Sequence, residues 1–147
     1  MTDQTKALLR GASRAFEVYD FKDPAFGFSW KQIDPEWRSW DAERYLTALE
    51  SDPAVKGYES DMAALESADL VILVLPCGKS AHLEAGWAVG AGKPLVIVLD
   101  ERAFEPDLMY RMAVKITTKL EEAVLWALVF QAEANDGGDE ARGGHDA

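Results

Sequence analysis

The apolar positions of the chain predict two buried strands joined by a helix. Residues 70–75 and 95–99 are unbroken apolar runs rich in Val, Ile and Leu, a pattern typical of strands buried on both faces. Residues 80–92 between them have the alanine content and length of a helix, and Gly92-Lys93-Pro94 ends it. A strand, a helix and a strand within about 30 residues form a βαβ unit. We therefore predict an α/β fold with a mainly parallel sheet.

The preceding part of the chain is predicted to be mostly helical. Apolar spacing predicts helices over residues 4–13, from Asp34-Pro35 to about residue 49, and over residues 53–67. Alternating positions over residues 15–21 predict one strand.

After the βαβ unit, shorter elements are predicted. They are a short helix over residues 105–112, a strand over 114–117 and a last helix over 120–132. The β-branched and aromatic residues of 124–130 are also compatible with a strand. Residues 135–147 are rich in glycine and lack large apolar side chains, which predicts a disordered tail after a single domain over residues 1–134.

Length and composition narrow the class of protein. A chain of 147 residues with 48% hydrophobic residues has room for one domain and one core. The net charge of −11 argues against binding to a nucleic-acid polymer. Cys77 is the single cysteine, which excludes an intramolecular disulfide and suits a reducing compartment. Without a signal-peptide pattern or a long apolar run, the expected location is the cytoplasm, with no membrane contact.

Candidate chemistry lies where the strand at 70–75 leads into the following helix. Ligands of open parallel sheets bind beyond the carboxyl ends of the strands, near helix N-termini. Ser80 is the expected N-cap, which places Glu84 at the fourth helical position and leaves Leu83 where a capping-box partner belongs. Glu84 is either a nucleophile or base among apolar neighbours, or an acidic residue stabilised only by the helix dipole.

Neighbouring polar residues have two interpretations each. His82 assists a substrate group or proton transfer, or simply faces solvent. Gly78, Lys79 and Ser80 form a loop suited to a phosphate, although the upstream glycine of a P-loop is absent. Cys77 is a thiolate for which the sequence identifies no general base, or a small buried hydrophobe.

Aromatic residues raise further alternatives. Tyr110 either reaches a neighbouring site or packs a helix. Four aromatic residues form either a lid that stacks on a nucleobase, or a cover for the sheet edge or a dimer interface, which we favour. They are Phe28, Trp30, Trp37 and Trp40.

The sequence resembles the nucleoside 2-deoxyribosyltransferase-like family at residues 61–75, 80–88 and 92–95. This family includes deoxynucleoside 5′-monophosphate N-glycosidases. The most specific part is Glu84-x-Gly86-x-Ala88 with the following Gly92-Lys93-Pro94. The resemblance implies a flavodoxin-like, or Rossmann-like, three-layer sandwich that needs no cofactor or metal. It also implies cleavage or transfer at the N-glycosidic bond of a nucleoside or nucleotide, in a homodimer or higher homo-oligomer.

The resemblance assigns roles to two carboxylates. Glu84 falls on the family's nucleophile, which attacks the anomeric carbon to form a glycosyl-enzyme intermediate, and Asp61 falls on the aspartate that contacts the base. This assignment fits a transition state that needs nearby negative charge and a departing base that needs a proton. The alternative function is a non-catalytic nucleotide-binding or interaction module on the same fold.

Two departures from the family pattern alter the prediction. The loop of residues 77–80 is cationic and hydroxyl-bearing where the transferases carry acidic residues, which favours a nucleotide over a free nucleoside. The family's first strand is also missing from the sequence. In a flavodoxin-like order it would lie between the strands at 15–21 and 70–75. Either these two strands pair directly, or another segment fills the gap, or the sequence is truncated at its start.

Overall fold

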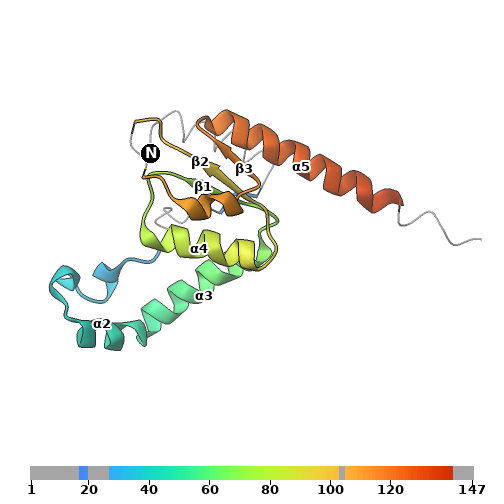
Figure 1. The fold of residues 1–147 in the computed structure, drawn as a ribbon. Helices are drawn as coiled ribbons and strands as arrows, with labels where there is room; N and C mark the ends of the chain where they lie inside the picture. The colour runs from blue at the N-terminus through green and yellow to red at the C-terminus, as the bar shows by residue number, and fades with distance from the viewer. Residues whose placement is uncertain (1–16, 20–26, 103–104, 141–147) are drawn as a thin grey trace, which may run out of the picture. The chain divides into compact units, whose positions relative to one another are not determined.

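The structure, a computed structural model, describes residues 17–19, 27–102 and 105–140 (Figure 1). These residues fall into two compact units. We name residues 19–68 the helical unit and the described residues from 69 onward the sheet unit. The helix expected at 4–13 lies outside the described residues. Of the strand expected at 15–21, only residues 17–19 are described, and they form no strand.

The sheet unit contains three parallel strands in the order β1-β2-β3 (Figure 1). They are β1 (Val71–Val74), β2 (Leu95–Val98) and β3 (Lys115–Thr117). Val71 pairs with Leu95, and Val96 pairs with Lys115. The α/β class and the parallel sheet are thereby confirmed. Within the described residues, no strand pairs with the free edge of β1.

Helices cover both faces of this sheet, so the unit has three layers. Leu95 and Ile97 of β2 pack in the cluster that contains Ala85 of α4 (Lys79–Gly90). Val96 and Val98 pack in the cluster that contains Ala123 of α5 (Leu120–Glu140). Because successive side chains of a strand point to opposite faces, the unbroken apolar sequence of β2 is buried on both sides.

The end of α4 matches the sequence prediction. Gly92 has a φ of 80°, a conformation that glycine adopts without strain. Its N–H donates to the carbonyl oxygen of Val89 at 2.9 Å, and the N–H of Lys93 donates to that of Ala88 at 2.9 Å. These two bonds form the Schellman motif that commonly ends a helix.

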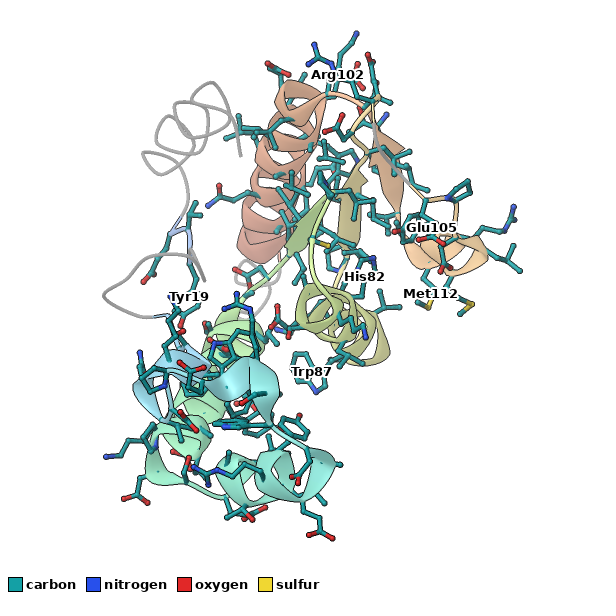
Figure 2. All side chains as sticks on the ribbon, turned by 90° about the vertical axis from the view of Figure 1, so that its left-hand side faces the viewer. Tyr19, His82, Trp87, Arg102, Glu105 and Met112 are labelled. Carbon is teal, nitrogen blue, oxygen red and sulfur yellow. The ribbon has the colours of Figure 1, made fainter. Side chains whose placement is uncertain are left out.

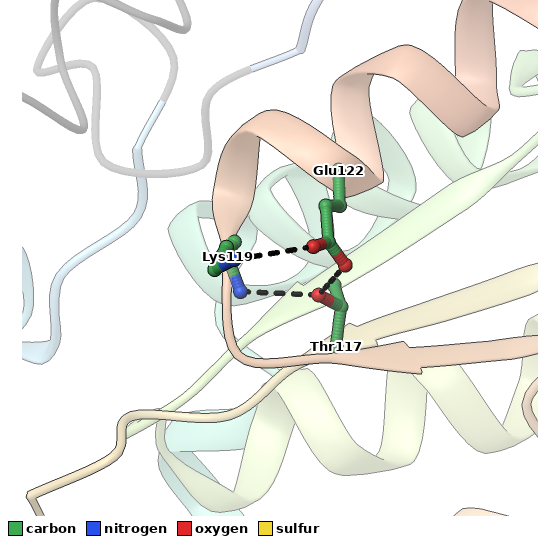
Figure 3. Close-up of polar contacts among 3 residues, drawn as sticks. All are labelled: Thr117, Lys119 and Glu122. Atoms are coloured by element: carbon green, nitrogen blue, oxygen red, sulfur yellow. Dashed lines mark hydrogen bonds and ion pairs between the residues drawn. The ribbon is translucent and has the colours of Figure 1, made fainter.

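A hydrogen-bonded turn joins β3 to α5 (Figure 3). The Thr117 hydroxyl donates to Glu122 Oε2 at 2.6 Å and accepts from the N–H of Lys119 at 3.1 Å. Lys119 Nζ lies 3.6 Å from Glu122 Oε1. The hydrogen bond from Thr117 is the main reason that the pKa of the Glu122 carboxyl is lowered. The buried Thr117 hydroxyl is therefore satisfied, and the start of α5 is tied to the strand.

The course of α5 decides between the helix and the strand that the sequence allowed for residues 124–130. Residues 124–130 are helical, so the strand alternative is wrong. The helix continues to Glu140, so it includes the first residues of the segment 135–147 for which the sequence predicted disorder. Once a helix is nucleated, each added residue gains a backbone hydrogen bond without needing an apolar side chain. Residues 141–147 lie outside the described part.

The helical unit is less regular than the sequence predicted. It contains η1 (Trp30–Gln32), η2 (Trp37–Ser39), α2 (Ala42–Leu49) and α3 (Asp52–Ser67). The single helix expected from residue 34 to 49 is wrong. Asp34 accepts the N–H of Glu36 at 2.9 Å and the indole N–H of Trp40 at 2.8 Å, which stabilises a turn instead. Asp41 caps α2 by accepting the N–H of Arg44 at 2.8 Å.

Aromatic rings pack against one another inside the helical unit. Trp30 makes edge-to-face contacts with Phe28, Trp40 and Tyr45, with ring centroids 4.8, 5.7 and 5.6 Å away respectively. Phe28 in turn lies against Gly57 of α3. These partly exposed rings therefore hold the segment before α2 against the helices of the unit, since such pairs add stability beyond their buried area. The lid and the dimer interface stay predictions.

Candidate functional site

The first turn of α4 begins earlier than the sequence predicted. Gly78, with φ −82° and ψ 177°, is the N-cap, and Lys79 is the first helical residue. The prediction of Ser80 as N-cap is therefore wrong. Glycine is also an accepted N-cap, and its extended backbone serves without a side-chain hydrogen bond. Lys79 and Ser80 are both exposed in this first turn.

The shift of the helix start changes the setting of Glu84. Glu84 now lies beyond the first turn of α4, where the helix dipole no longer acts strongly on a charge. Its side chain is half-buried. At about 100° per residue it lies about 60° around the helix from Trp87, as the sequence indicated. The dipole explanation for Glu84 is therefore weaker than the sequence suggested.

A cavity of about 180 Å³ opens on the opposite side of α4. It lies between that helix, the apolar sheet face and the segment of η3 (Leu108–Met112). Its lining residues are Leu73, His82, Ala85, Gly86, Leu95, Ile97, Asp107, Met109, Tyr110 and Met112. Glu84 is not one of them. Helical spacing puts it about 160° around the axis from His82.

His82 and Tyr110 are brought together at this cavity. His82 Nε2 lies 3.1 Å from the Tyr110 hydroxyl oxygen, and the two rings stack with centroids 6.1 Å apart. Figure 2 shows His82 on the side of α4 that faces the segment of Glu105 and Met112, with Trp87 on another side. The sequence placed both residues in the site, although it could not show that they touch.

Two more contacts hold the His82 ring. Nδ1 lies 3.0 Å from the carbonyl oxygen of Gly78 and 3.6 Å from Cys77 Sγ. Cys77 is half-buried and packs against the apolar cluster beneath α4. The sequence offered Cys77 no partner, and the structure supplies His82. The sequence could have indicated this contact, because Cys77 and His82 lie on either side of the predicted start of one helix.

Burial raises the pKa of the Tyr110 hydroxyl, and the nearby charges of Asp107, Cys77 and Glu105 act in the same direction. Tyr110 therefore keeps its proton well above neutral pH and can donate it to a ring nitrogen. Asp107 also caps η3, since its Oδ1 accepts the N–H of Met109 at 2.7 Å.

Asp61 lies on α3 in the helical unit, whereas Glu84 belongs to the sheet unit. The Tyr19 hydroxyl donates to Asp61 Oδ1 at 3.4 Å and lies 3.2 Å from Ser60 Oγ. Burial raises the pKa of the Asp61 carboxyl, and the hydrogen bond from Tyr19 opposes that shift. A carboxyl with a raised pKa holds its proton to higher pH, which suits a proton donor.

Neither a metal cluster nor a membrane span is present in the described part of the chain. No group of three or more His, Cys, Asp or Glu side chains there is arranged to hold a metal ion. None of the helices described is both long and apolar enough to cross a bilayer.

The fold and the cavity define an α/β protein with a three-strand parallel sheet and polar groups gathered beside α4. No protein-family model and no curated protein matches the sequence. The resemblance to the nucleoside 2-deoxyribosyltransferase-like family therefore rests on the motifs quoted above.

Proposed function

We propose that the protein cleaves or transfers at the N-glycosidic bond of a nucleoside or nucleotide, with Glu84 as the nucleophile. The observation that carries the proposal is the half-buried Glu84 on the helix that follows the first strand of a parallel sheet. Its carboxylate attacks the anomeric carbon, a C–O bond forms, and the C–N bond to the base breaks. Water or a second base then resolves the glycosyl-enzyme intermediate.

Asp61 is proposed to contact the departing base and supply its proton. Its raised pKa supports this role, because such a carboxyl keeps its proton to higher pH than an ordinary aspartate does. Tyr19, which donates to Asp61, keeps the carboxyl oriented.

The exposed Lys79 and Ser80 are proposed to hold the phosphate of a nucleotide, together with the N–H groups of the first turn of α4. A cation and a hydroxyl beside free backbone donors favour an anion. The proposed substrate is therefore a nucleotide in preference to a free nucleoside. His82 and Tyr110 line the cavity on the other side of α4 from Glu84, so they are proposed as ligand contacts of the alternative, non-catalytic function and not of the sugar that Glu84 attacks.

Release of the free base tests this proposal. The full-length protein is incubated with a panel of nucleosides, deoxynucleoside monophosphates and NAD, and the free base is followed by chromatography. Glu84→Gln is expected to lower the rate by about a thousandfold or more, and Asp61→Asn by about a hundredfold. The exposed carboxylates Glu121 and Glu59 provide matched controls, Glu121→Gln on α5 and Glu59→Gln on α3. Release at an unchanged rate in Glu84→Gln would contradict the nucleophilic role.

The second candidate function is a non-catalytic nucleotide-binding module. The observation that favours it is the separation of Glu84 from the cavity that His82 and Tyr110 line. A nucleotide that raises the melting temperature while the wild-type protein releases no base from any compound would support this candidate and oppose the enzyme.

A further inference from the structure

Three side chains of the sheet unit form a continuous chain of polar contacts that does not include Glu84, the proposed nucleophile. Cys77 lies in the loop after β1, His82 on α4 and Tyr110 on η3. The Sγ of Cys77 is 3.6 Å from His82 Nδ1, and His82 Nε2 is 3.1 Å from the Tyr110 oxygen. A thiol, an imidazole and a group that orients the imidazole are the components of an activated cysteine.

The surroundings fix which nitrogen of His82 carries hydrogen. A carbonyl oxygen can only accept, so the 3.0 Å contact between Nδ1 and the Gly78 carbonyl requires a hydrogen on Nδ1. In the neutral ring Nε2 is then the acceptor, and the Tyr110 hydroxyl donates to it. The single hydrogen on Nδ1 is therefore shared between two acceptors, the Gly78 carbonyl at 3.0 Å and, more weakly, Cys77 Sγ at 3.6 Å. A donor beside the sulfur favours the thiolate over the thiol.

Nearby carboxylates act on Tyr110, and the dipole of α4 acts on Cys77. Burial and the carboxylates of Asp107 and Glu105 keep Tyr110 protonated, so it remains a donor to His82 at neutral pH. Cys77 directly precedes the N-cap of α4, where the partial positive charge of the helix also favours an anion.

Small molecules can reach this cluster. Cys77 is half-buried, so its stem is fixed while part of its surface stays accessible. His82 is exposed, and the cavity of about 180 Å³ is lined by His82 and Tyr110, whereas Cys77 is next to His82 and is not one of the lining residues. A liquid water occupies about 30 Å³, so this volume admits a small organic molecule.

We propose that Cys77 is a reactive thiol, activated by the Nδ1–H of His82 and positioned through Tyr110, that forms covalent adducts with small uncharged electrophiles. The thiol releases its proton to solvent, the thiolate sulfur attacks the electrophilic carbon, and the leaving group departs with the bonding electrons. With iodoacetamide the S–C bond forms as the C–I bond breaks, and iodide leaves. His82 and Tyr110 are positioning residues in this reaction. The proposal does not depend on the N-glycosidic activity.

The rate of alkylation against pH tests the proposal. The native full-length protein is treated with excess iodoacetamide from pH 5 to pH 10, without any nucleoside, and adduct formation is followed by intact mass. Because the chain has one cysteine, a single thiol adduct is on Cys77. The half-maximal rate is expected well below about pH 8.5, the ordinary pKa of a cysteine thiol.

Variants separate activation from a structural effect. In His82→Ala the midpoint is expected to move up towards the ordinary value, and the rate at pH 7 to fall about fivefold. Tyr110→Phe, which keeps the ring and removes the hydroxyl, is expected to move the midpoint in the same direction by less. Leu83→Ala, at a neighbouring residue whose side chain is 76% exposed, is the matched control and should leave the profile unchanged.

Two results would overturn the proposal. One is a wild-type midpoint equal to that of the protein unfolded in urea. The other is a His82→Ala profile that coincides with the wild-type profile while circular dichroism shows the native fold.

Discussion

At the scale of single residues, the fold acts on the pKa of the Asp61 carboxyl in two opposite ways. Its pKa is raised by burial and lowered by the hydrogen bond from Tyr19. Because the folded state holds the proton more tightly than the unfolded chain, the resulting stability is present at low pH. It is lost as the pH rises through the folded-state pKa.

Tyr19→Phe is predicted to raise the pKa of Asp61 further. The hydrogen bond from Tyr19 favours the charged carboxylate, so its removal leaves the burial effect unopposed. The variant should also cost more stability at pH 7, where a larger fraction of Asp61 carries the charge that this hydrogen bond stabilises, than at pH 3. Carbon-detected NMR titration of the Asp61 carboxyl and urea unfolding at both pH values measure these effects. Tyr58→Phe, on the same helix with a side chain 67% exposed, is the control. An unchanged midpoint in Tyr19→Phe would contradict the role assigned to this hydrogen bond.

Sequence reasoning found individual site residues more readily than their contacts. Glu84 stood out because carboxylates are rare on an otherwise apolar helix. The pairing of Cys77 with His82 was missed because it depends on where α4 begins. With Gly78 as the N-cap, the Gly78 carbonyl accepts from His82 and turns its ring towards the thiol. A helix start that is wrong by two residues hides such a contact.

At the scale of elements, the packing of α3 depends on a glycine. A Cβ at Gly57 would lie 2.8 Å from the Cβ of Phe28 and 2.9 Å from its Cγ. These atoms are near the backbone of Phe28, so they cannot move aside as the end of a flexible side chain can. Gly57 therefore permits a close approach that any larger residue would prevent.

Gly57→Ala is predicted to destabilise the protein by about 1–3 kcal/mol, although alanine is the better helix former. Gly86→Ala on α4 is the matched control, because its new Cβ meets nothing within 4 Å. That variant should gain about 0.5–1 kcal/mol. Urea unfolding of both variants measures the difference. If Gly57→Ala proves as stabilising as Gly86→Ala, the close contact with Phe28 is not present in solution.

Regular elements could be predicted from the sequence and irregular ones could not. The runs at 70–75 and 95–99 became β1 and β2 because only a two-sided buried strand accommodates unbroken β-branched residues. The segment before α2 has no period. There the Asp34 side chain replaces backbone hydrogen bonds, and Trp30 fixes the chain through ring contacts. Such contacts link residues whose proximity only the folded chain reveals.

At the scale of the whole molecule, the two units have different kinds of core. The sheet unit buries apolar side chains on both faces of β2, where Val96 and Ile97 are 0% and 1% exposed. In the helical unit, α2 has one fully buried side chain, Ala48. The sequence did not predict the division, because residues 68 and 69 join the units without a composition change that marks a linker.

This contrast predicts unequal protection from hydrogen exchange in the intact protein. The amides of β2 are bonded in a central strand and should exchange only through global unfolding, whereas those of α2 should exchange through local opening. The free energy of opening should therefore be lower for α2 by about 2 kcal/mol or more. It should also depend less on added urea, because local opening exposes less surface.

Native-state exchange at increasing urea concentration, followed by NMR or mass spectrometry, measures both quantities on the same sample. Amides of α3 give an internal reference, since this longer helix buries Ala54 and Leu65. They should open at a higher free energy than those of α2. Equal free energies and equal urea slopes for α2 and β2 would mean that the two units unfold as one cooperative body, contrary to the prediction.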